Sequence, residues 1–131
     1  MILLDTNICI YIINHKPANV IKRFYEFQLG EIGLSAIVAS ELSYGVHKSG
    51  SPKNRQALEL FLAPLEILAF DESVIWHYAK IRNDLEKRGC IIGAMDMLIA
   101  AHALSSDSIL VTNNQKEFSR VPGLKLDNWV N

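Results

Sequence analysis

Short apolar stretches alternate along the chain with longer segments of helical periodicity. Apolar runs with the length of buried strands occur at Ile2–Leu4, Ile32–Leu34, Leu65–Phe70 and Ile109–Thr112, with a possible fifth at Leu124–Leu126. The intervening patterns predict helices over about Thr6–Asn14, Ala18–Gln28, Ala36–His47, Lys53–Ala63, Asp71–Arg88 and Met95–Leu104. Buried strands that alternate with helices predict an α/β fold in which a parallel sheet is covered on both faces.

Proline, glycine and small polar residues mark the ends of these elements. Pro17 is placed to begin the helix at Ala18, and Gly30 to end it. Ser35 is a plausible N-cap for the following helix. Asp71 also follows an apolar strand, but an acid at a helix start needs no catalytic explanation, and we interpret it as a cap.

The composition fits one globular domain over residues 1–131, with 50% hydrophobic and 21% charged residues. No apolar run approaches the roughly 18 residues of a membrane span, and no export leader is recognisable, so we expect a cytoplasmic protein. Cys9 and Cys90 are isolated among apolar neighbours and are expected to be buried free thiols. The net charge of −1 argues against a generic basic nucleic-acid binder. It does not exclude a nucleic-acid enzyme, because acids in an active site offset a basic surface.

Three acids stand beside or inside hydrophobic segments far apart in sequence: Asp5, Glu41 and Asp96. Taken alone, Asp5 is as well explained by capping the next helix, and Glu41 is better explained as a solvated surface residue. Asp96 is harder to dismiss, because the residues that follow it are all apolar. An unpartnered carboxylate at the end of a buried helix would cost several kcal/mol.

A divalent cation is the simplest partner that all three acids can share. Mg²⁺ and Mn²⁺ prefer oxygen ligands and need few protein carboxylates, because they keep several waters. Without such a cation the acids would repel one another, and their pKa values would rise.

Four motifs follow one another along the chain: Leu4-Asp5-Thr6-Asn7, Ser40-Glu41-Leu42-x-Tyr44-Gly45, Asp96-x-x-Ile99-Ala100-Ala101-His102-Ala103 and Val111-Thr112-Asn113-Asn114-x-x-Glu117-Phe118. In this order they resemble the motifs of the PIN-domain ribonucleases, and more narrowly those of the VapC toxins of VapBC toxin–antitoxin modules. The likeness continues through Gly123-Leu124 to Trp129, and so covers almost the whole chain.

The resemblance implies a three-layer α/β/α fold with four or five parallel strands, and an endoribonuclease that depends on Mg²⁺ or Mn²⁺. It assigns Asp5 and Asp96 as the principal metal-binding acids and Glu41 as the third catalytic acid. The supporting polar residues would be Thr6, Asn7, Thr112 and Asn114.

Many PIN domains have a fourth acid, and two residues of this chain are candidates for its position. Asn114 stands where that acid is expected and offers an oxygen without a charge. Glu117, three residues later, is the alternative, unless it lies on the surface. We expect one firmly bound metal ion rather than two. His102 is expected to be a buried histidine satisfied by a backbone carbonyl rather than an acid–base catalyst.

The predicted function is a toxin that hydrolyses structured RNA, with tRNA, and initiator tRNA cut in its anticodon loop, as the favoured substrate. The implied partners are a VapB-type antitoxin, the RNA and a second copy of the chain, with no membrane. The alternative function is a noncatalytic RNA- or protein-binding module that keeps a metal site. A haloacid-dehalogenase-like enzyme is disfavoured, because it needs an acid where this chain has Asn7.

Overall fold

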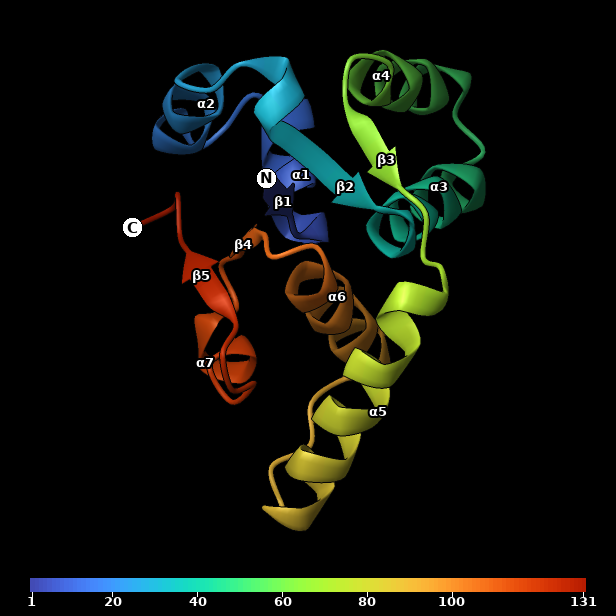
Figure 1. The fold of residues 1–131 in the computed structure, drawn as a ribbon. Coiled ribbons are helices and arrows are strands. Elements are labelled where there is room, and N and C mark those ends of the chain that lie inside the picture. Colours follow the sequence, from blue (N-terminus) through green and yellow to red (C-terminus); the bar gives the residue numbers. More distant parts are fainter.

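The computed structural model describes residues 1–131 and contains a five-stranded parallel sheet in the order β3-β2-β1-β4-β5 (Figure 1). The strands are β1 (Ile2–Leu4), β2 (Ile32–Ser35), β3 (Glu66–Leu68), β4 (Ile109–Val111) and β5 (Lys125–Asp127). Each pairs in parallel with its neighbours; Leu3, for example, is in register with Gly33 of β2 and Leu110 of β4. The predicted parallel sheet is confirmed, and so is its fifth strand.

Helices cover both faces of the sheet and complete the three-layer α/β/α architecture (Figure 1). They are α1 (Thr6–Ile13), α2 (Ala18–Tyr25), α3 (Ala36–Ser49), α4 (Pro52–Leu62), α5 (Glu72–Lys87), α6 (Ala94–Ser105) and α7 (Gln115–Phe118). The chain moves from β1 outward to β2 and β3, then crosses back to β4 and β5. Right-handed crossovers in these two directions place α1 to α4 on one face and α5 to α7 on the other. The direction changes beside β1, at its border with β4.

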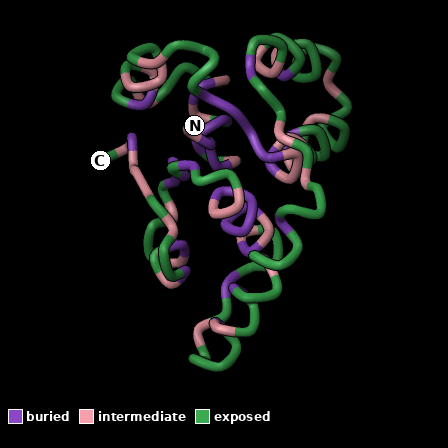
Figure 2. The backbone as a smooth tube through the Cα atoms, in the orientation of Figure 1, coloured by how far each residue is buried: buried purple, intermediate pink, exposed green.

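The core is centred on the inner strands and α6, and buried apolar residues of α1, α3 and α5 join it (Figure 2). Leu4, Leu34 and Leu110 are 0% exposed, and each such side chain contributes about 2 kcal/mol through its removal from water. On α6, the small side chains of Ala100 and Ala103 are also fully buried. Their size allows this helix to pack closely against β2 and β4. The buried helix predicted after Gly93 is therefore confirmed.

Several predicted boundaries need correction. The helix that begins at Ala18 ends at Tyr25, and Gly30 lies instead in a 3-10 turn over Leu29–Glu31. This 3-10 turn is separate from α2, because Gln28 and Glu31 form a capping box at its start, in which each side chain accepts the other's backbone N–H. The predicted start of this helix is confirmed, because Pro17 is the N-cap of α2 and the helix begins at Ala18.

Other local predictions are confirmed or refined. Ser35 caps α3 and Asp71 caps α5, each by accepting a backbone N–H bond. Cys9 is a buried free thiol as predicted, but Cys90 is only half-buried. The short helix α7 was not predicted from the sequence. No helix is both long and apolar enough to cross a membrane.

Candidate active site

The candidate site lies at the carboxyl ends of β1 and β4. Asp5 directly follows β1 and Thr112 directly follows β4, and these strands are neighbours in the sheet. Ligands of open α/β sheets bind at this edge, where the chain connections change direction. The backbone N–H of Asp5 donates to the Val111 carbonyl at 2.9 Å, which continues the β1–β4 pairing up to the acid.

Asp5 is held by hydrogen bonds to both of its carboxylate oxygens. Oδ1 accepts the backbone N–H of Thr6 at 2.8 Å, so Asp5 caps α1. Oδ2 accepts the hydroxyl of Thr112 at 2.7 Å. Burial raises the pKa of Asp5 despite these two bonds, which lower it. The carboxylate thus serves as a cap and remains a buried charge in need of a cationic partner.

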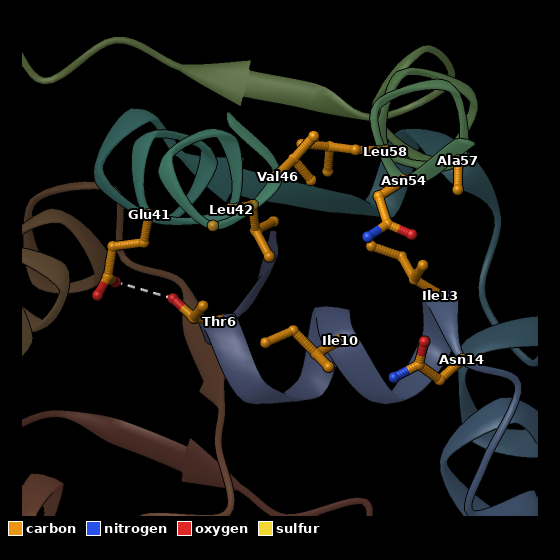
Figure 3. Close-up of a pocket in the computed structure, with 11 residues that line it drawn as sticks. Thr6, Ile10, Ile13, Asn14, Glu41, Leu42, Val46, Asn54, Ala57 and Leu58 are labelled. Carbon is orange, nitrogen blue, oxygen red and sulfur yellow. Dashed lines mark hydrogen bonds between the residues drawn. The ribbon is translucent and has the colours of Figure 1, made fainter. Parts of the chain in front are cut away.

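Glu41 approaches the site from α3 (Figure 3). The hydroxyl of Thr6 donates to Oε1 of Glu41 at 2.8 Å, which connects the start of α1 to the middle of α3. Each threonine of the chain therefore orients one acid: Thr6 binds Glu41, and Thr112 binds Asp5. Both threonines were predicted to be supporting residues, but the sequence did not reveal a partner for either.

Asp96 lies in the first turn of α6 and is half-buried. Its pKa is raised to about 6, first by burial, then by the charges of Asp5, Glu117 and Glu41, and also by a hydrogen bond with Glu117. All three of these neighbours are acids, and no basic side chain acts on Asp96 in the opposite direction. The charges of three acids, Asp5 before α1, Glu41 of α3 and Glu117 of α7, therefore act on Asp96 at this edge of the sheet.

The acids fit a hard divalent cation by their chemistry, since all their donor atoms are oxygens. No three acidic, histidine or cysteine side chains converge into a ready-made cage. Mg²⁺ is usually bound through only one or two carboxylates together with waters, so it does not require a closed cage.

Two other predicted supporting residues, Asn7 and Asn114, have no side-chain hydrogen bond to the acids, unlike the two threonines. Asn7 is exposed on α1. Asn114 is the N-terminal residue before α7, and it is its backbone N–H that donates to the Thr112 hydroxyl, at 2.9 Å. The backbone of Asn114 therefore helps to orient Thr112, whereas the Glu117 side chain acts on Asp96 and raises its pKa.

Comparison with known proteins agrees with this arrangement. The family model described as the PIN domain matches residues 2–124. The chain belongs to the PIN-domain family.

Within the PIN family, the similar curated proteins are VapC ribonucleases. Ribonuclease VapC2 of Rickettsia felis is 44% identical over 129 residues, which cover 97% of this chain and 96% of the relative. The tRNA(fMet)-specific endonuclease VapC of Shigella flexneri is 41% identical over 128 residues, with coverage of 97% and 96%.

Solved structures of toxin–antitoxin complexes share the fold of this PIN domain. The VapBC2 structure from Rickettsia felis, bound to a DNA fragment from its promoter, matches with a TM-score of 0.92 at 44% identity, covering 98% of this chain and 99% of that one. DNA-bound VapBC from Salmonella typhimurium matches with a TM-score of 0.91 at 38% identity, with coverage of 98% and 97%.

The position of Glu117 in this PIN domain is fixed by contacts made beyond the acid cluster. The guanidinium of Arg120, just after α7, donates to the carbonyl of Ile91 at 3.2 Å. Arg88 donates to the backbone carbonyl of Arg120 and forms an ion pair with Asp84. These bonds tie α7 to the loop that leads into α6. They explain how a residue on a short helix comes to lie beside Asp96.

A cavity of about 360 Å³ opens next to the acids, between α1, α3 and α4 (Figure 3). Thr6 and Glu41 lie at one end of it. The remaining lining is largely apolar and includes Ile10, Ile13, Leu42, Val46 and Leu58. A chain lying in this groove would therefore reach the acid cluster at one end.

Proposed function

We propose that this protein is a divalent-metal-dependent endoribonuclease toxin that hydrolyses phosphodiester bonds in structured RNA. The observation that carries the proposal is the gathering of Asp5, Glu41, Asp96 and Glu117 at one sheet edge without a basic partner. The membership of the PIN family and the VapC names of the relatives support it.

We assign Asp5 and Asp96 as the principal metal ligands, with Glu41 as the third catalytic acid. Thr112 and Thr6 would hold Asp5 and Glu41 in orientation through the bonds already described. Glu117 is the better candidate for the fourth acid, because its carboxylate interacts with Asp96. Orienting bonds of this kind typically alter metal affinity or activity 10- to 100-fold when removed.

Mg²⁺ or Mn²⁺ would supply a nucleophilic hydroxide near neutral pH and offset the charge that develops on the phosphoryl oxygen. The protein's part is to align the carboxylates, and the bound cation would favour the ionised form of Asp96, whose pKa is raised to about 6 without it. In-line attack by water yields 5′-phosphate and 3′-hydroxyl ends. The RNA 2′-hydroxyl is not used as the nucleophile.

We propose tRNA as the substrate, and initiator tRNA cut in its anticodon loop as the first candidate. Support comes from the relatives of Shigella flexneri and Salmonella typhimurium, both named tRNA(fMet)-specific endonucleases. A single-stranded loop also presents unstacked bases and an accessible backbone to a small protein.

We propose a VapB-type antitoxin as the partner that controls this activity, since similar solved chains come from VapBC complexes. The apolar groove beside Thr6 and Glu41 is the surface we assign to it, because its occupant would also block the acids. We further propose that residues 1–131 form a single domain, that the protein acts in the cytoplasm beside its RNA, and that two copies associate. Exposed apolar residues such as Trp76 on α5, 78% exposed, support the last point.

Cleavage of total tRNA by the purified, antitoxin-free protein tests the proposal. We expect discrete cuts with Mg²⁺ or Mn²⁺, none with EDTA, and none with the Asp5→Asn variant. If no RNA is cut under any metal while the protein still binds RNA or antitoxin, the noncatalytic module becomes the better description.

A further inference from the structure

His102 occupies a buried junction behind the acid cluster. It lies on α6 and is only 3% exposed. Its ring packs edge-on against Phe70, with 5.5 Å between centroids. His102 follows Asp96 by six residues, which is about 120° away around a helix of 3.6 residues per turn. It therefore faces away from Asp96, and a direct acid–base role is excluded by this geometry.

His102 makes one bond with a hydroxyl and another with the Ala69 backbone, which is the kind of bond that the sequence led us to expect. Nδ1 of His102 lies 2.7 Å from Oγ of Ser35. Ser35 is itself fully buried, and its Oγ accepts the backbone N–H of Ile37 at 3.1 Å. A single hydroxyl thus joins the helix that carries Asp96 to the first turn of the helix that carries Glu41.

Burial favours a neutral His102 ring, in which one of the two nitrogens is a hydrogen-bond acceptor. Burial lowers the pKa of His102, against the opposing influence of the Asp71 carboxylate and the Ala69 backbone. With Nδ1 unprotonated, Ser35 donates its hydroxyl hydrogen to His102 and uses its oxygen to cap α3. Both groups are then satisfied without water.

The bond between His102 and Ser35 fixes a distance and a direction between α3 and α6, which apolar packing alone does not. Around it, Val38 and Leu42 of α3 are buried in the apolar core, and apolar contact is non-directional. A short hydrogen bond between buried groups fixes distance and direction. Functional constellations generally need their groups held to about 0.5 Å.

We propose that the His102–Ser35 pair is a positioning device that sets the placement of Glu41 relative to Asp96. The inference rests on the proposed function, because it takes these two acids to serve the same cation. His102 acts through Ser35 and α3 and does not touch the substrate.

Mn²⁺ affinity of the full-length protein, measured by electron paramagnetic resonance, tests the proposal without RNA. Ser35→Ala and His102→Gln should weaken Mn²⁺ binding about tenfold, since glutamine places its amide too far along the side chain to replace Nδ1. His102→Asn should restore most of the affinity, because its Oδ1 occupies the place of Nδ1. Ser51→Ala, which removes the cap of α4, should bind Mn²⁺ like the parent.

Three further measurements make the result decisive. In a Glu41→Gln background, His102→Gln should cause little additional loss, because the acid that it positions is already gone. In cleavage assays, His102→Gln should lower kcat and leave KM for RNA unchanged. Circular dichroism should report the same fold for each variant.

The outcomes separate the two proposals. If the parent binds Mn²⁺ and Asp5→Asn does not, but folded His102→Gln and Ser35→Ala bind as tightly as the parent, the positioning role is wrong and the proposed function stands. If the parent itself shows no Mn²⁺ site that depends on Asp5, the proposed function fails, and the inference fails with it.

Discussion

Among the acids of the site, Asp96 is the one whose charge most clearly destabilises the metal-free fold. Its pKa of about 6 reflects burial and three neighbouring acids, so its charge destabilises the metal-free fold at neutral pH. The rise from the ordinary value of 3.8 corresponds to at most about 3 kcal/mol, and solvent screening at a half-buried side chain reduces this to about 1 kcal/mol.

Asp96→Asn should therefore abolish cleavage and stabilise the metal-free protein by about 1 kcal/mol at pH 7.5. The folded pKa lies above the unfolded value, so the folded state binds the proton more tightly. The penalty in the parent is present above pH 6 and is relieved as pH falls from about 6 towards 4. Urea unfolding of both proteins across this range should show the difference shrinking. The pKa of His102 is lowered, but both proteins contain this residue, so its contribution cancels from the difference between their free energies of unfolding.

The two threonines allow the orienting bonds to be tested separately. Thr112→Val removes the donor to Asp5, and Thr6→Val removes the donor to Glu41, with little change of shape. Each should lower metal-dependent cleavage 10- to 100-fold. Because Asp5 is the more buried acid, Thr112→Val should have the larger effect. A single-turnover rate equal to the parent's for both variants would show that these bonds do not serve catalysis.

Individual acids could be predicted from the sequence because their neighbours are so apolar. Asp5 follows a buried strand and Asp96 begins a buried helix, so each stands out against its surroundings. Glu41 has polar neighbours, so its prediction as a site residue was supported only by the other two acids and by the family resemblance. The bond between His102 and Ser35 joins residues 67 positions apart, and no local pattern reveals it.

At the scale of elements, α7 decides which residue completes the acid cluster. Its four residues are too few for a periodic pattern, and the sequence therefore left Asn114 and Glu117 open. The bond from Arg120 to the Ile91 carbonyl and the bond from Arg88 to the Arg120 carbonyl are also nonlocal. Helices with caps or long apolar faces were predicted well, whereas the end of α2 was placed too late because Gly30 was read as its stop.

Glu117→Gln should reduce cleavage at least tenfold, because it removes a charge that acts directly on Asp96. Asn114→Ala should have a small effect, because the bond to Thr112 comes from the Asn114 backbone. Comparing kcat for the two variants under saturating Mn²⁺ decides between them. A large loss in Asn114→Ala with normal activity in Glu117→Gln would reverse the assignment of the fourth acid.

For the whole molecule, the fold explains why distant acids meet. β1 lies at the centre of a parallel sheet, and the connections turn in opposite directions on its two sides. The alternation of strands and helices predicted this class of fold, but not the strand order, which depends on how the elements pack.

Divalent metal should stabilise the whole fold, because it binds the folded acid cluster and has no such site in the unfolded chain. At 100 times its dissociation constant, Mn²⁺ should add about 2.7 kcal/mol and raise Tm by several degrees. Asp5→Asn should show little of this shift. Differential scanning calorimetry with Mn²⁺, and with Ca²⁺ for comparison, would measure it. An equal rise of Tm in parent and Asp5→Asn would place the stabilising metal elsewhere.

The chemistry of the cut RNA ends is the sharpest test of metal-dependent hydrolysis at the acid cluster. The parent protein should be incubated with tRNA and Mn²⁺, and the fragments from each mapped cut should be analysed for their termini. Hydrolysis at the acid cluster predicts 5′-phosphate and 3′-hydroxyl ends that disappear together in Asp5→Asn and in EDTA. Fragments ending in a 2′,3′-cyclic phosphate, or cuts that persist in EDTA, would contradict the account.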